Sequence, residues 1–143
     1  MRLDLLALIA GLAGIAISAY LTVQHYAAVP LACPVGGVVN CEVVLTSSYG
    51  VIGGSTVPTS AAGIVWFVVS AGLAAALWRR PRPLLARLQQ AWSAIGLVTV
   101  LYLVYIEIVK IGAICIWCSA AHVLVLLIFL IALPRPAADR VRR

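Results

Sequence analysis

Four cysteines form two pairs whose positions suit thiol–disulfide chemistry. Cys115 and Cys118 make a C-x-x-C motif, whereas Cys33 and Cys41 lie eight positions apart in a segment rich in Gly, Pro, Ser and Thr. Residues three apart share one face of a helix, at a Cα separation that a disulfide can bridge. A thiol at a helix N-terminus is favoured as the thiolate, which is the nucleophile in disulfide exchange. The C-x-x-C motif therefore indicates a redox pair.

Other interpretations of these cysteines stay open. Cys33 and Cys41 could form a static structural disulfide, or a shuttle that exchanges with the C-x-x-C pair through a mixed disulfide. Cys115 and Cys118 could be inert buried thiols. Half of a zinc site is disfavoured, because no Cys or His completes it at a usual spacing, so we expect no metal. In a shuttle, the first pair would meet a soluble protein and the second a lipid-soluble acceptor such as a quinone.

Helices in lipid must position these cysteines. Of the 143 residues, 64% are hydrophobic and only 10% are charged, whereas about 25% of an ordinary soluble domain is charged. This composition excludes a soluble enzyme and a disordered chain. Apolar stretches near the ~20 residues that cross a bilayer cover residues 5–25, 60–78, 91–109 and 111–133. We therefore predict an all-α integral membrane protein, a four-transmembrane-helix bundle that forms one domain over residues 1–143.

Basic residues give this bundle an orientation. Of the ten Lys and Arg residues, only Lys110 falls at the end opposite to the other nine. Those nine lie before span one, in a connection over 79–90, and after span four: Arg2, Arg79, Arg80, Arg82, Arg87, Arg135, Arg140, Arg142 and Arg143. The positive-inside rule then predicts a multi-pass plasma-membrane protein whose termini and 79–90 connection are cytoplasmic. This explains the net charge of +6, so we expect no nucleic-acid partner.

The same orientation places both cysteine pairs outside the cytoplasm. Cys33 and Cys41 fall in a long extracytoplasmic loop over 29–59, between spans one and two, and the C-x-x-C motif opens span four. Disulfides persist on that side of a bacterial membrane. Within the loop, residues 42–45 are expected to form a short interfacial helix.

Two further pairs of side chains are expected at the membrane interfaces. Trp78 and Trp92 flank the 79–90 connection, where an aromatic belt usually forms. Glu107 and Lys110 stand three apart beside the short outer turn, a spacing that favours an interfacial ion pair over a proton relay.

In this order the motifs resemble the vitamin K epoxide reductase family, and in particular its bacterial disulfide-forming branch. The resemblance covers nearly the whole chain. Its motifs are Cys33 and Cys41, Ser47 followed by Ser48-Tyr49-Gly50, the segment Pro58-Thr59-Ser60-Ala61-Ala62-Gly63, and Cys115-Ile116-Trp117-Cys118. It implies a four-helix bundle around a quinone pocket at the outer end. The electron acceptor would be a menaquinone, a ubiquinone or a quinone of vitamin K type.

The resemblance also implies roles for single residues. Cys118 would face the quinone, and Cys115 would be attacked by Cys41 through a transient disulfide. Cys33 would then exchange with the partner protein. Ser47 matches a hydroxyl near the pocket, where it would cap the loop helix or polarise a group near the active cysteines.

At two positions this sequence departs from the vertebrate members. Thr59 stands in place of an Asn that hydrogen-bonds a quinone oxygen, and His122 stands in place of a Tyr one turn after the C-x-x-C motif. Both side chains, together with Ala62, are expected at the quinone. Many bacterial members carry a fused thioredoxin-like domain after the bundle. This chain ends about ten residues after span four, so we expect a separate, DsbA-like protein of thioredoxin fold as the partner.

The sequence thus predicts an enzyme, a quinone-dependent thiol–disulfide oxidoreductase that supports disulfide formation in exported proteins. Electrons would pass from the thioredoxin-like partner through Cys33 and Cys41 to Cys115 and Cys118, and then to a quinone. One alternative is the reverse direction, reduction of a vitamin K quinone or epoxide by thiols. Another is a non-enzymatic four-helix membrane protein with structural disulfides.

Overall fold

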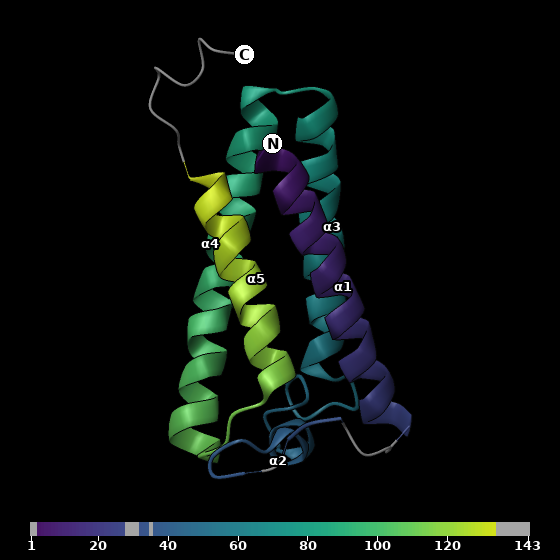
Figure 1. The fold of residues 1–143 in the computed structure, drawn as a ribbon, viewed down its shortest axis with the longest axis vertical. Coiled ribbons are helices and arrows are strands. Elements are labelled where there is room, and N and C mark those ends of the chain that lie inside the picture. Colours follow the sequence, from purple (N-terminus) through teal and green to yellow (C-terminus); the bar gives the residue numbers. More distant parts are fainter. Residues whose placement is uncertain (1–2, 28–31, 35, 134–143) are drawn as a thin grey trace.

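The fold consists of helices, four of which run along the long axis of the molecule (Figure 1). The computed structural model describes residues 3–27, 32–34 and 36–133. Its elements are α1 (Leu3–Ala27), α2 (Cys41–Thr46), α3 (Thr59–Arg79), α4 (Pro83–Tyr105), the π-helix η1 (Ile106–Ile111) and α5 (Ile116–Ala132). Within these residues β-structure is limited to isolated bridges. The predicted all-helical fold is confirmed, and the short α2 lies across one end of the long helices.

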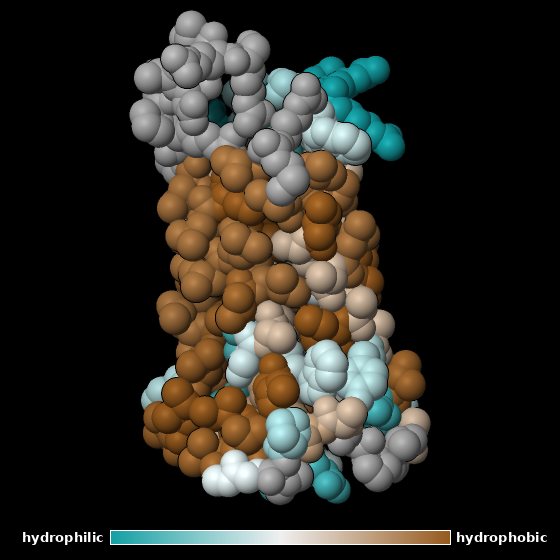
Figure 2. Space-filling view, viewed as in Figure 1, coloured by the Kyte–Doolittle hydropathy of each residue, from teal (hydrophilic) through white to brown (hydrophobic). Residues whose placement is uncertain are grey.

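Three stretches of helix are long and apolar enough to cross a membrane. They are α1, α3 and the continuous helix of α4 and η1 over Pro83–Ile111, while α5 is apolar but shorter, with 17 residues. On the face seen in Figure 2, hydrophobic residues cover the middle of the molecule, and polar residues gather towards its ends. The structure therefore has three clear span candidates and a fourth, shorter apolar helix.

The long helices pack as a closed ring. α1 contacts α3 and α5, and α4 contacts the same two helices. Small residues allow the closest approaches: a Cβ on Gly14 would collide with the Phe67 ring, and a Cβ on Gly11 would lie 3.0 Å from that of Ala71. In lipid such small residues are what lets helix backbones come together. Farther along the same seam, the hydroxyls of Thr22 and Ser60 share a 2.9 Å hydrogen bond.

Two helix boundaries differ from those expected. α4 begins at Pro83 rather than near residue 91, because proline suits the first turn of a helix, where no N–H donor is needed. The expected 79–90 connection therefore shrinks to the residues between α3 and α4. α5 begins at Ile116 rather than at residue 111, because Gly112, at a φ of 69°, caps η1 directly after Ile111 and ends that helix. That left-handed conformation favours glycine.

The two ends of the bundle differ in charge. The short α3–α4 connection lies at the same end as the start of α1 and the end of α5 (Figure 1). The side chains of Arg79, Arg80 and Arg82 are exposed there. The remaining predicted cytoplasmic arginines outside α4, which are Arg2, Arg135, Arg140, Arg142 and Arg143, lie outside the described residues. Lys110 belongs to η1, at the end that carries α2.

The connection between α1 and α3 is folded over its described residues. Gly36 and Val39 exchange backbone hydrogen bonds around a tight turn, with Gly37 at a φ of 57°. After α2, whose position matches the expected short helix, the chain turns back through a bridge between Val51 and Pro58. The long connection therefore has a defined shape over the end of the bundle.

Candidate functional site

All four cysteines meet in one place. Cys41 and Cys115 are buried, with 1% and 0% of their surface exposed, in a cluster that includes Val44 and Ala113. Cys33 and Cys118 pack against this cluster and are partly buried. Cys33 and Cys41 form a disulfide with a Cα–Cα distance of 6.2 Å, whereas Cys115 and Cys118 are free thiols. Two pairs far apart in the sequence are thus in contact and differ in oxidation state.

Backbone hydrogen bonds tie the two pairs together. The N–H of Asn40 donates to the carbonyl of Ile114 at 3.1 Å, and the N–H of Ile114 donates to the carbonyl of Val38 at 2.9 Å. Each bond involves the residue directly before Cys115, and one involves the residue directly before Cys41. Asn40 also caps α2, because its Oδ1 accepts from the N–H of Val43 at 3.1 Å. Cys41 is therefore held near Cys115 by hydrogen bonds between the segments that directly precede the two cysteines.

A second set of contacts holds the residue before Cys33. The indole N–H of Trp117, inside the C-x-x-C motif, donates to the carbonyl of Ala32 at 3.0 Å. The hydroxyl of Tyr20 in α1 accepts from the N–H of Ala32 at 3.3 Å. The two rings lie 5.1 Å apart between centroids. This clamp, formed by Tyr20 and Trp117 around Ala32, fixes the start of the disulfide-bearing connection against α5.

Cys115 occupies the capping position that precedes α5. Its sulfur accepts from the backbone N–H of Cys118 at 3.4 Å. Hydrogen bonding from the Cys118 side chain, and then from backbone N–H groups of the first turn, holds the pKa of the Cys115 thiol below its usual value, although burial opposes this. Cys115 is therefore more readily present as the thiolate, which makes it a good leaving group from a mixed disulfide.

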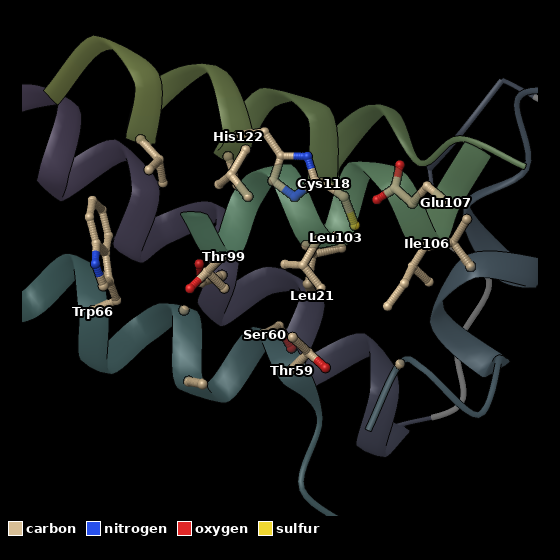
Figure 3. A pocket seen from close by; sticks show the side chains of 18 of the residues that line it. Leu21, Thr59, Ser60, Trp66, Thr99, Leu103, Ile106, Glu107, Cys118 and His122 are labelled. Atoms are coloured by element: carbon tan, nitrogen blue, oxygen red, sulfur yellow. The ribbon is translucent and has the colours of Figure 1, made fainter. Parts of the chain in front are cut away.

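A cavity of about 480 Å³ lies inside the ring of helices. Of the four cysteines only Cys118 lines it. Figure 3 shows Cys118 and His122 reaching into the cavity from α5, Glu107 from η1, and Thr59 and Ser60 from α3. The two free thiols thus face different neighbours, since Cys115 contacts the buried cluster with Cys41 and Cys118 faces the cavity.

Ser47, expected near the pocket, and the other residues expected at the quinone also line this cavity. Ser47 ends α2 and donates its hydroxyl to the carbonyl of Val44 at 2.8 Å, so it acts as a cap. Thr59 donates to the carbonyl of Tyr49 at 3.3 Å. Ala62 and His122 complete this set of lining residues. Within the described part of the chain, the imidazole of His122 has no hydrogen-bond partner, so its donor is available to a ligand.

Two tryptophans line the cavity farther from the cysteines. The indole N–H of Trp66 donates to the carbonyl of Trp92 at 3.3 Å, and that of Trp92 donates to the carbonyl of Trp66 at 3.2 Å. The rings stack at 12°. Gly96 makes room for this pair, because a Cβ there would collide with the Trp66 indole. The expected place of Trp92 in an interfacial aromatic belt is therefore wrong, because its indole reaches α3 inside the bundle.

Glu107 also departs from its expected role. It is 6% exposed and lines the cavity, whereas the side chain of Lys110 is exposed. The predicted interfacial ion pair is therefore not formed. The reason is local: the wider turns of a π-helix change which side chains share a face, so a spacing of three no longer aligns them. A charged residue inside an apolar span was the sequence signal for a functional position.

Sequence reasoning missed two aromatic pairs: Trp66 and Trp92, which are hydrogen-bonded to each other, and Tyr20 and Trp117, which both hydrogen-bond the backbone of Ala32. Tryptophan in an apolar stretch is common, and only the fold shows which carbonyl its N–H reaches. Among the described residues, no group of three or more His, Cys, Asp or Glu side chains is placed to hold a metal ion.

Comparison with known proteins agrees with this arrangement. A search of curated proteins finds no match to the chain. The profile described as the vitamin K epoxide reductase family matches residues 5–133, which is nearly the whole chain. With its apolar helices and its two cysteine pairs, this membrane protein belongs to the vitamin K epoxide reductase family.

Proposed function

We propose that this protein is a membrane thiol oxidoreductase that carries electrons from a thioredoxin-fold protein to a quinone. The observation that supports this most strongly is the contact between the two cysteine pairs. Cys41 of the disulfide and Cys115 of the free pair share one buried cluster, and the other free thiol, Cys118, lines the cavity. The four cysteines thus form one cluster that extends from the half-buried Cys33 to the cavity.

The exchange between the pairs balances without any further reactant. The Cys41 thiolate attacks the sulfur of Cys115 in a Cys115–Cys118 disulfide, and Cys118 leaves as a thiolate that takes a proton. Cys33 then attacks Cys41 and releases Cys115. The products are a Cys33–Cys41 disulfide and a free Cys115/Cys118 pair, which is the oxidation state of this structure. In this proposal the structure represents the protein loaded with two electrons.

The cavity fits a quinone as electron acceptor. Its wall is mostly apolar, as an isoprenoid quinone requires, and its polar groups are few and convergent. His122 offers a free donor to one quinone oxygen, while Thr59 and Ala62 line the same cavity from the start of α3. A bound quinone supplies the capacity to take up two electrons and two protons. The chain supplies the thiols, the apolar enclosure and the donor.

The partner and the orientation follow from the same proposal. Cys33 is the more exposed member of its disulfide, so a thiol of a separate, DsbA-like protein would attack there. The exposed arginines beside the α3–α4 connection favour that end as the cytoplasmic one. The cysteines then lie on the extracytoplasmic side of the plasma membrane, and the product is disulfide bonds in exported proteins.

Quinol formation by the purified protein tests this function. The full chain in detergent is mixed with a reduced thioredoxin-fold protein and a short-chain quinone, and the quinone absorbance is followed. We expect turnover for the wild type and background rates for Cys118→Ala. A Ser70→Ala variant, which removes a buried hydroxyl away from the cysteines, serves as the matched control. Undiminished turnover in Cys118→Ala would falsify the relay.

A further inference from the structure

Glu107 has a buried carboxyl that takes no part in the proposed exchange between the cysteine sulfurs. It lies in the π-helix η1 with 6% of its surface exposed, on the cavity wall that also carries Cys118. Single turns of π-helix in otherwise α-helical spans occur often at functional sites. A carboxyl inside an apolar span is costly, and its position on a cavity wall points to a use in the reaction.

The surroundings of Glu107 orient its carboxyl. The backbone N–H of Cys115 stabilises the charged carboxylate, so the carboxylate lies beside the start of the C-x-x-C motif. In Figure 3 the carboxyl points towards the sulfur of Cys118. Both thiols of the pair are close enough to interact electrostatically with it. The carboxyl therefore lies next to the cysteine pair on the wall of the cavity.

The described part of the chain offers no cation to neutralise this carboxyl. Lys110, in the same π-helix, is exposed, and the α2 segment that packs on η1 contributes Glu42, which is also exposed. The titratable group that α5 presents to the cavity, besides the cysteine, is His122. An ion pair would give Glu107 a structural purpose, and without one a proton acceptor and donor is the simpler explanation.

We propose that Glu107 is the proton-transfer residue of the inner cysteine pair, taking the thiol proton of Cys118 and delivering it to the electron acceptor in the cavity. This inference rests on the proposed function. It also assigns the π-helix a purpose, because an α-helical continuation would place residue 107 differently relative to the cysteines.

The step balances as follows. Cys115 and Cys118 together lose two electrons as the bond between their sulfurs forms, and the quinone gains these two electrons. Glu107 takes one proton from Cys118 and gives it to one quinone oxygen, so it ends in its starting state. The second proton leaves Cys115 for solvent, and an equal proton enters from water at the other oxygen.

Single-turnover kinetics separate this role from the rest of the relay. Protein reduced with dithiol is mixed with a short-chain quinone, and quinol formation is timed for Glu107→Gln, Glu107→Asp and the control Lys110→Gln. Because general acid–base catalysis contributes about 10²–10⁴-fold, we expect Glu107→Gln to be at least about 100-fold slower. Glu107→Asp should recover part of the rate, and Lys110→Gln should match the wild type.

Two further measurements do not depend on quinone turnover. Reduction of the Cys33–Cys41 disulfide by a reduced thioredoxin-fold protein should be unchanged in Glu107→Gln. In quinone-free protein the proton taken from Cys118 has no acceptor in the cavity and stays on Glu107. Infrared difference spectra between the dithiol and disulfide states of the inner pair should then contain a carboxyl C=O band that Glu107→Gln lacks.

The outcomes are distinguishable. Three results would each overturn the role of Glu107 while leaving the relay intact. The first is a quinol-formation rate in Glu107→Gln close to that of the wild type. The others are an equally large fall in the rate of Cys33–Cys41 reduction and the absence of the infrared band. A wild-type protein that reduces no quinone would overturn the proposed function, and this inference with it.

Discussion

The two cysteine pairs touch each other but are built differently. Cys33 and Cys41 lie on a connection that is shaped by turns, isolated bridges and the six-residue helix α2, and Cys33 is partly exposed. Cys115 and Cys118 lie at the start of a long apolar helix, one fully buried and the other on a cavity wall. The first pair is accessible from outside, whereas the second is reached through Cys41 or through the cavity. This difference suggests that one pair selects a protein and the other a lipid-soluble molecule.

Removing Cys41 should have the largest effect, because it separates the pair that meets the partner protein from the pair that meets the cavity. Cys41→Ala removes the one thiol of the α1–α3 connection that is buried in the same cluster as Cys115, so quinol formation driven by a reduced thioredoxin-fold protein should fall to background. A small membrane-permeant dithiol should still drive it, because Cys118 is open to the cavity. Quinone absorbance under the two reductants measures the contrast. Protein-driven turnover that survives in Cys41→Ala would show that the partner reaches the inner pair directly.

Filling the space beside Trp66 should weaken quinone binding without affecting the Cys33–Cys41 disulfide. A Cβ at Gly96 collides with the Trp66 indole, and such overpacking costs about 1–3 kcal/mol. We expect Gly96→Ala to lower the unfolding temperature in detergent and to raise the KM for quinone. Reduction of the Cys33–Cys41 disulfide should not change. Gly72→Ala is the control, because a Cβ there meets open space, and its variant should be at least as stable as the wild type.

Weakening the clamp on Ala32 should slow the step that joins the two pairs. Trp117→Phe removes the 3.0 Å bond to the Ala32 carbonyl but keeps a ring against Tyr20. A net hydrogen-bond contribution of about 1 kcal/mol corresponds to a rate roughly fivefold lower. Stopped-flow measurement of electron transfer between the pairs reports this. Trp78→Phe, at the opposite end of the bundle, should have no effect, and equal losses in both variants would argue against the clamp.

The smallest effect concerns the acidity of Cys115. A hydrogen bond from the Cys118 side chain is the largest cause of the lowered pKa of Cys115. The Cys118→Ser variant keeps a donor at this position, whereas the Cys118→Ala variant removes it. A thiol with a lowered pKa stays thiolate as the pH falls below the ordinary thiol range. In a chain lacking Cys33 and Cys41, modification of Cys115 by a thiosulfonate should therefore persist to lower pH in the Cys118→Ser variant than in the Cys118→Ala variant. Identical pH profiles would assign the shift to the backbone donors instead.

Much of the fold could be predicted from the sequence because its strongest signals are physical and local. Long apolar stretches predict helices in lipid, and the C-x-x-C spacing predicts a pair at a helix start. The boundaries at Pro83 and Gly112 were less accurate, because hydropathy alone does not reveal where a helix extends into polar residues or changes its pitch. The π-helix in particular has no simple sequence signature.

The finer parts of the site depend on contacts between distant residues. No sequence pattern brings Asn40 to Ile114, or the indole of Trp117 to the carbonyl of Ala32. Glu107 was assigned to the surface because its spacing from Lys110 suits an α-helix, and the π-helix places it inside instead. The individual roles of Ser47, Thr59, Ala62 and His122 stay predictions, although all four line the cavity.

Trapping a disulfide between Cys41 and Cys115 tests the central claim most directly, because the claim is that electrons pass between these two sulfurs. A chain carrying Cys33→Ala and Cys118→Ala keeps one thiol of each pair and lacks both resolving thiols. After mild oxidation, we expect mass spectrometry of its peptides to show a Cys41–Cys115 disulfide within single chains. Chains in which both thiols stay free, or pair only between molecules, would contradict the relay.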